Sequence, residues 1–105
     1  MPRRREIVLL RFPFSDPSSS KRRPVVVLND EDQRGDFACI AVTSNPDAPD
    51  GREIPQSLME FGALPRRSFA RTRKIYTLHR SLEADRVGSL TEEAFREIMA
   101  AVCQD

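Results

Sequence analysis

The sequence contains little cysteine, histidine or glycine, and it has no long apolar run. Its 105 residues include 2 Cys, 1 His and 4 Gly. Two distant cysteines and a single histidine cannot supply a four-ligand zinc site with local spacing, nor a disulfide framework. The glycines are scattered at positions 35, 51, 62 and 88, which excludes a glycine-rich phosphate loop. No apolar run approaches about 18 residues, so no membrane span is expected.

The few cysteines and the N-terminus indicate the cellular compartment. Cys39 stands in the apolar run 37–42 and Cys103 near the end of an amphipathic segment, so both are interpreted as small core residues. The apolar run 7–10 behind the basic residues 3–5 is too short for a signal peptide. We therefore expect a protein of the reducing cytoplasm that uses neither a metal nor another cofactor.

Length and composition indicate one small folded domain over residues 1–105. At this length a chain buries roughly 60–70% of its unfolded surface, which is enough for one core. With 39% hydrophobic and 31% charged residues, the chain is too apolar to be disordered.

The net charge of +1 conceals a strong segregation of charge along the chain. Residues 1–30 carry +4, 31–65 carry −5, 66–80 carry +6 and 81–105 carry −4. The two basic blocks can converge into one anion-binding surface, or they can form two separately solvated faces. Composition alone favours the second interpretation.

The apolar pattern predicts several short strands and one helix. Strands are expected at 6–11, 25–28, 37–43 and 68–78, separated by turn-rich loops at 12–20 and 44–52. Residues 54–64 are ambiguous between a strand and a short helix. Thr91 is expected to cap a C-terminal helix whose first turn contains Glu92 and Glu93, because carboxylates are favourable there.

The apolar residues of that helix form one stripe, which comprises Ala94, Phe95, Ile98, Met99 and Val102. The order of elements predicts a mainly β fold with a terminal helix (α+β): a small curled antiparallel sheet or barrel that carries the helix on its surface.

Arginine and hydroxyl chemistry is what the residues offer. The acidic residues cluster in loops and on the helix, where solvation explains them, and the lone His79 is more simply structural. Arg22 and Arg23 precede one strand and Thr43-Ser44 end another. A third strand region carries basic residues: Arg66, Arg67, Arg71, Arg73 and Lys74.

If these strand ends are neighbours, guanidinium groups and hydroxyls share one groove. Guanidinium groups bind phosphate with two parallel hydrogen bonds, and Phe12, Phe14 and Phe69 offer faces on which bases can stack. This is the equipment of a single-stranded nucleic-acid site. The alternative is that the arginines are solvated and the phenylalanines belong to the core.

The ordered motifs resemble the MazF/PemK (Kid) family of type II toxin–antitoxin ribonucleases. They are an apolar strand with the start of its loop at 7–14, Arg23-Pro24 before a second strand, and Ala41-Val42-Thr43-Ser44 at the end of a third. A basic strand at 71–78 and Gly88-Ser89-Leu90 before the closing helix complete the pattern. The match spans nearly the whole chain in the family's order, and it implies an SH3-like small barrel of the MazF/Kid/CcdB type.

The resemblance implies roles for individual residues. Arg23 and Thr43 match the central catalytic residues, and Arg71 matches a further functional arginine of one branch. With the groove argument, the expected substrate-binding residues are Arg22, Ser44, Arg71, Arg73, Lys74 and Phe14.

Departures from the family pattern bear on the mechanism. Arg5-Glu6 stands where many members have Gly and an acidic residue, and the loop before Arg23 lacks the Glu-Gln of some branches. Arg73 occupies the position of an acidic residue in the branch that uses the later arginine. Because arginine is a poor general base, no residue is assigned that role.

The expected function is that of a metal-independent, sequence-specific endoribonuclease toxin that cuts single-stranded RNA. The resemblance implies a homodimer, neutralised by a small acidic antitoxin whose disordered tail lies along the basic groove. Two alternatives remain open: a non-catalytic toxin of the same fold that binds a protein target, as a gyrase poison does, and a degenerate member that only binds RNA or its antitoxin.

Overall fold

The structure is a computed structural model that describes residues 2–11, 22–82 and 85–104. Within them lie seven strands, two short 3-10 turns and one α-helix. The strands are β1 (Glu6–Arg11), β2 (Arg22–Val27), β3 (Asp36–Thr43), β4 (Gly51–Glu53), β5 (Met59–Gly62), β6 (Phe69–His79) and β7 (Asp85–Leu90). The turns are η1 (Gln56–Leu58) and η2 (Arg80–Leu82), and the helix is α1 (Glu92–Val102).

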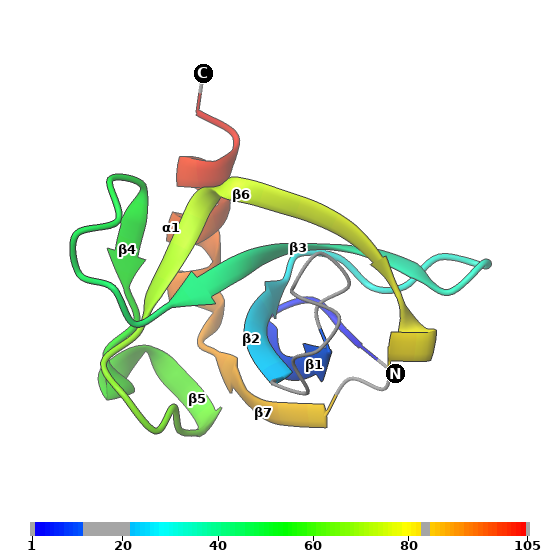
Figure 1. The fold of residues 1–105 in the computed structure, drawn as a ribbon, viewed down its shortest axis with the longest axis horizontal. Helices are drawn as coiled ribbons and strands as arrows, with labels where there is room; N and C mark the ends of the chain where they lie inside the picture. The colour runs from blue at the N-terminus through cyan, green and yellow to red at the C-terminus, as the bar shows by residue number, and fades with distance from the viewer. Residues whose placement is uncertain (1, 12–21, 83–84, 105) are drawn as a thin grey trace.

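The described strands form one curled antiparallel sheet in the order β4-β6-β3-β2-β1-β7-β5. Figure 1 shows the long β6 arching over β3, with β1 and β2 curving beneath them and α1 lying behind the sheet. This is the mainly β fold with a terminal helix that the sequence predicts. None of the described helices is long and apolar enough to cross a membrane.

Apolar side chains cover both faces of the central strands. Successive residues of a strand point to opposite faces, so Ile7 and Val26 pack toward α1 while Val8 and Val25 pack into a second cluster. The valines at 25–27 are fully buried, which explains why β2 is a continuous apolar run. Burial also raises the pKa of the Cys39 thiol to about 12, as expected for a core cysteine.

The helix has the predicted cap and apolar stripe. The Thr91 hydroxyl accepts a hydrogen bond from the Ala94 amide at 3.1 Å, and Glu92 and Glu93 occupy the first turn. Ala94, Phe95 and Ile98 are buried. Cys103 is different: it lies at the C-terminal cap, beyond the last turn of the stripe, and it is exposed, so its predicted place in the core was wrong.

The structure corrects one prediction, resolves a second and adds a strand. Arg22 and Arg23 lie inside β2 and not before it, because they pair with Arg11 and Leu10 of β1. The ambiguous segment 54–64 contains both a 3-10 turn and a strand. Strand β7 was not predicted at all. The loop expected at 12–20 lies outside the described residues.

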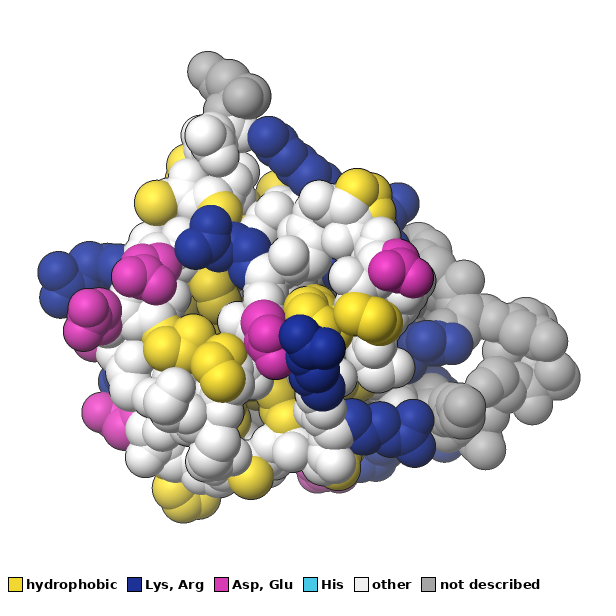
Figure 2. Space-filling model, turned by 90° about the vertical axis from the view of Figure 1, so that its left-hand side faces the viewer, with side chains coloured by type: hydrophobic (Ala, Val, Ile, Leu, Met, Phe, Trp, Pro, Cys, Tyr) yellow, Lys and Arg dark blue, Asp and Glu magenta, His cyan; other side chains and the backbone are white. Residues whose placement is uncertain are grey.

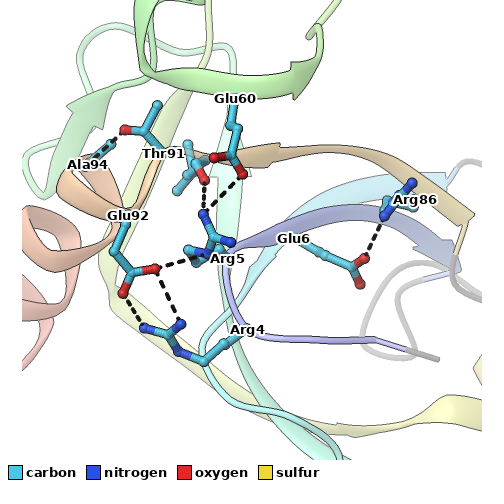
Figure 3. A network of polar contacts seen from close by, with 9 residues as sticks. Arg4, Arg5, Glu6, Glu60, Arg86, Thr91, Glu92 and Ala94 are labelled. Carbon is cyan, nitrogen blue, oxygen red and sulfur yellow. Dashed lines mark hydrogen bonds and ion pairs between the residues drawn. The ribbon is translucent and has the colours of Figure 1, made fainter.

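An arginine cluster joins the N-terminal end of β1 to the start of α1 (Figure 3). Arg5 adopts a left-handed backbone with φ 76°, a conformation that favours glycine. Its Nη1 donates to the Leu90 carbonyl at 3.1 Å and to Glu60 at 3.2 Å, and its Nε lies 3.1 Å from Glu92 Oε2. Arg4 makes a second ion pair with Glu92 at 2.7 Å. These five residues, here called the N-terminal cluster, tie three separate elements together.

Candidate nucleic-acid interface

The register of β2 and β3 brings Arg23 opposite Thr43. Val25 pairs with Ala41 and Val27 with Cys39 in antiparallel register. Continuing that register by two residues toward the start of β2 places Arg23 across from Thr43, on the same face of the sheet. Two residues that are 20 positions apart in the sequence therefore become neighbours at one end of the sheet.

These residues line a groove of about 590 Å³, here called the Arg23 groove. Its polar lining includes Arg22, Arg23, Thr43, Ser44, Arg66, Ser68, Arg71 and Tyr76. Leucine, proline, alanine and valine side chains make up the rest of the described lining. The two basic blocks of the sequence thus converge, since the groove holds Arg22 and Arg23 from the first and Arg66 and Arg71 from the second.

The described part of the Arg23 groove lining is cationic. Among the described residues that line it there is no Asp, Glu or His. Arg23 and Arg66 are exposed, and neither guanidinium has an ion-pair or hydrogen-bond partner within the described residues. Unpaired arginines beside hydroxyl groups form a site for a phosphate anion, because guanidinium donors match phosphate oxygens.

The Thr43 hydroxyl is already oriented by the backbone. Its Oγ1 accepts a hydrogen bond from the Asn45 amide at 3.1 Å, so the hydroxyl hydrogen is left to donate to a ligand in the groove. Ser44 follows it as an exposed residue of the same lining. Arg22 is held differently from Arg23, since its Nη1 pairs with the Asp85 carboxylate of β7.

A bulge in β6 separates the basic residues of that strand. Val42 pairs with Ala70 and Ile40 with Ile75, so the single residue Ala41 of β3 stands opposite four residues of β6, Arg71 to Lys74. Bulges redirect side chains. Arg71 lines the Arg23 groove, whereas Arg73 and Lys74 do not.

Arg73 and Lys74 line a second depression of about 560 Å³, here called the Lys74 groove. Asp50, Arg52 and Arg71 also line it, so Arg71 belongs to both grooves. The Arg73 Nη1 donates to the Gln104 carbonyl at 2.7 Å, beyond the end of α1. Figure 2 views the molecule from the β4 side and shows its Lys and Arg side chains in separate groups, several next to acidic side chains.

Asp50 holds Arg71, and sequence reasoning missed this pair. Asp50 Oδ1 accepts from Arg71 Nε at 2.9 Å and lies 2.9 Å from Nη2, while Oδ2 accepts from the Arg73 amide at 3.0 Å. Desolvation alone would raise the pKa of Asp50, but these hydrogen bonds outweigh it and hold the pKa below its ordinary value. The Asp50-Gly51 dipeptide signals a turn, yet nothing in it indicates a partner 21 residues away.

Phe69 and His79 have structural positions. Phe69 is buried, and the Arg67 guanidinium lies 5.1 Å from the centre of its ring, so Phe69 offers no stacking face. Phe14 and Phe12 lie outside the described residues.

His79 receives a hydrogen bond from the Ser81 amide at Nδ1 and therefore donates from Nε2 to the Arg34 carbonyl, at 2.7 Å. Tyr76, the one tyrosine of the sequence, lines the Arg23 groove and was not predicted there.

Known proteins share this fold. The MazF of Deinococcus radiodurans superposes with a TM-score of 0.74 over 96% of this chain and 92% of its own, at 20% identity. A MazE–MazF complex from the same organism gives 0.77 over the same shares, also at 20% identity. An endoribonuclease in complex with its cognate antitoxin, from a mycobacterial species, gives 0.68 over 96% and 88% at 15% identity.

A sequence model places the chain in a family. The model, described as the PemK-like, MazF-like toxin of type II toxin–antitoxin systems, matches residues 3–104. Comparison with curated protein sequences gave no match. Because the family model covers almost the whole chain and the solved structures show the same fold, the chain belongs to the PemK-like, MazF-like toxins of type II toxin–antitoxin systems.

Proposed function

We propose that this toxin is a metal-independent, sequence-specific endoribonuclease that cuts single-stranded RNA in the Arg23 groove. The observation that carries the proposal is the exposed Arg23 guanidinium, which has no partner among the described residues and shares with Thr43 a groove whose described lining has no acidic residue. A solved neighbour named as an endoribonuclease supports it.

The proposed reaction uses the RNA's own nucleophile. The 2′-oxygen attacks the adjacent phosphorus as the bond to the 5′-oxygen breaks. The proton of the 2′-hydroxyl passes to water and the departing 5′-oxygen takes a proton from water, so that the products are a 2′,3′-cyclic phosphate and a 5′-hydroxyl. Arg23 donates hydrogen bonds to the phosphoryl oxygens, where negative charge accumulates, and the Thr43 hydroxyl positions the phosphate. The described lining offers no Asp, Glu or His as general base, so orientation and charge stabilisation are the protein's main contributions.

Cleavage of mixed RNA oligonucleotides in EDTA tests this function. The wild type is expected to produce fragments with cyclic phosphate ends, and Arg23→Ala to cut at least about 100-fold more slowly, by analogy with the loss of an oxyanion-hole donor. Arg34→Ala is the matched control, because Arg34 is an exposed arginine in the turn before β3, at the other end of that strand from Thr43. Intact RNA with the wild type, or equal cutting by Arg23→Ala, would refute the proposal and favour a toxin that only binds its target.

The antitoxin partner follows from charge, and the homodimer follows from membership of the family alone. We infer a homodimer, and a cognate antitoxin with an acidic, disordered tail, since such a tail complements the cationic groove and would exclude RNA from it. Solved neighbours that are MazE–MazF complexes support an antitoxin partner. The proposed site of action is the cytoplasm, where single-stranded RNA is found.

A further inference from the structure

The arginines of the Arg23 groove differ in whether their charge is compensated. Arg23 and Arg66 have no acidic partner among the described residues, whereas Arg71 shares its charge with Asp50, whose side chain is 9% exposed. A carboxylate on one side of a guanidinium cancels much of its attraction for an anion on the other side. Arg71 is therefore a poor phosphate ligand compared with its two neighbours.

Arg71 is nevertheless the most firmly oriented of these three arginines. Its backbone pairs with Gly51 of β4, and its Nε and Nη2 face Asp50 Oδ1. Asp50 is fixed in turn, since its Oδ2 accepts from the Arg73 amide and its carbonyl accepts from Thr72. The arginine reaches the groove with its orientation set before any ligand binds.

The geometry leaves one edge of the guanidinium available. Asp50 uses Nε and one hydrogen of Nη2, so Nη1 and the outer hydrogen of Nη2 have no partner among the described residues. Two parallel N–H donors match two neighbouring acceptors, and on a neutral base the best match is guanine, through O6 and N7. In single-stranded RNA this edge of the base is accessible.

We propose that Arg71, held by Asp50, is a specificity-determining residue that binds the O6 and N7 edge of a guanine beside the bound phosphate. This assignment rests on the proposed function, because it requires RNA in the Arg23 groove. The three arginines of the groove then have different roles. Arg23 and Arg66 bind phosphates of the RNA backbone, and Arg71 recognises a base. Asp50 is then a positioning residue that touches no RNA.

Binding of uncleavable RNA tests this assignment independently of cleavage. The probes are 2′-O-methyl oligonucleotides of about 12 nucleotides: all uridine, uridine with one guanine, and uridine with one 7-deazaguanine, which lacks N7. Fluorescence anisotropy is measured over a salt series. The wild type is expected to bind the guanine probe roughly 5- to 150-fold more tightly than the other two.

Three variants separate base recognition from phosphate binding. Arg71→Lys keeps the charge but loses the paired donors, so the guanine preference disappears while the salt dependence stays. Arg66→Ala, the matched control, keeps the preference but lowers the slope of log affinity against log salt by roughly 0.7, the value of one single-strand phosphate contact. Asp50→Ala frees the Arg71 charge, so the preference falls while the salt slope rises.

A merely structural role for Asp50 predicts a different result, because a damaged fold would weaken binding to all probes alike. Thermal melts verify that each variant folds. If Asp50→Ala does not fold, Arg71→Lys alone tests the assignment. The assignment is overturned if the wild type shows no guanine preference, if Arg71→Lys retains it, or if Arg71→Lys and Arg66→Ala behave alike. RNA cleavage by the wild type in EDTA would stand unaffected by any of these outcomes.

Discussion

Arg5 and Arg23 show how the same side chain serves two regions of the molecule differently. In the N-terminal cluster Arg5 lies against two carboxylates and a buried carbonyl, and its side chain is 26% exposed. In the Arg23 groove, Arg23 is exposed and has no acidic partner within the described residues. Both arginines stand in basic runs of the sequence, so the sequence run does not distinguish them. Acidic partners identify an arginine that stabilises the fold, and the absence of such partners among the described residues identifies one that is available to a ligand.

The greatest contrast is expected when each arginine is replaced by alanine and the free energy of unfolding is measured. Arg5→Ala leaves the buried Leu90 carbonyl without its side-chain donor and should destabilise the fold by about 1–3 kcal/mol. Arg23→Ala removes no ion pair or side-chain hydrogen bond among the described residues and should change stability by less than about 0.5 kcal/mol. Urea unfolding of the two variants measures both values, and equal losses would erase the distinction between the regions.

A second comparison isolates the backbone strain at Arg5. Arg5→Gly removes the same ion pairs as Arg5→Ala, but glycine adopts φ 76° without the steric cost that a Cβ imposes. The glycine variant should therefore be about 1 kcal/mol more stable than the alanine variant. The same urea titrations measure this difference. If the alanine variant is the more stable one, the left-handed backbone carries no strain.

The smallest expected effect is a pH dependence confined to the N-terminal cluster. The hydrogen bond from Arg4 holds the pKa of Glu92 below its ordinary value of 4.5. A carboxyl whose pKa is lowered by folding stabilises the protein above its unfolded pKa, and this stabilisation disappears as the pH falls through the folded value. Arg4→Ala should thus lose less stability than the wild type between about pH 6 and about pH 3.

Arg23→Ala serves as the control for this titration, because it should lose as much stability on acidification as the wild type. Asp50, whose pKa is also lowered, contributes equally to all three proteins and cancels in the comparison. Denaturant midpoints at several pH values provide the measurement. Identical acid profiles for Arg4→Ala and the wild type would show that the Arg4–Glu92 pair is not coupled to folding.

Much of the fold was predictable because its signals are local. The apolar run of β2, the boundaries of β1 and the Thr91 cap all follow from residues that are close in sequence. Strand β7 gives no such signal, since Asp85 and Gly88 are poor strand formers. It is a strand because β1 and β5 pair with it on both sides, which is a tertiary cause.

The site was predictable in part. The family resemblance pairs Arg23 with Thr43, whereas the residues alone leave open whether the two strand ends are neighbours; the structure shows that both residues line one groove. The separation of Arg71 from Arg73 and Lys74 depends on the bulge in β6, and the bulge depends on register against β3. Whether Arg23 and Thr43 catalyse cleavage stays a prediction until the cleavage assay is done.

The sheet order has a consequence for how the molecule is made. Much of the groove is lined by β2, β3 and β6, which are neighbours in space, yet β6 begins 26 residues after β3 ends. When the ribosome has synthesised the chain as far as Thr43, Arg23 and Thr43 are both present. Strand β6, which carries Arg71 and Tyr76, has not yet been synthesised. The complete groove forms only when β6 pairs with β3, so the growing chain holds an unfinished site during the synthesis of more than two dozen residues.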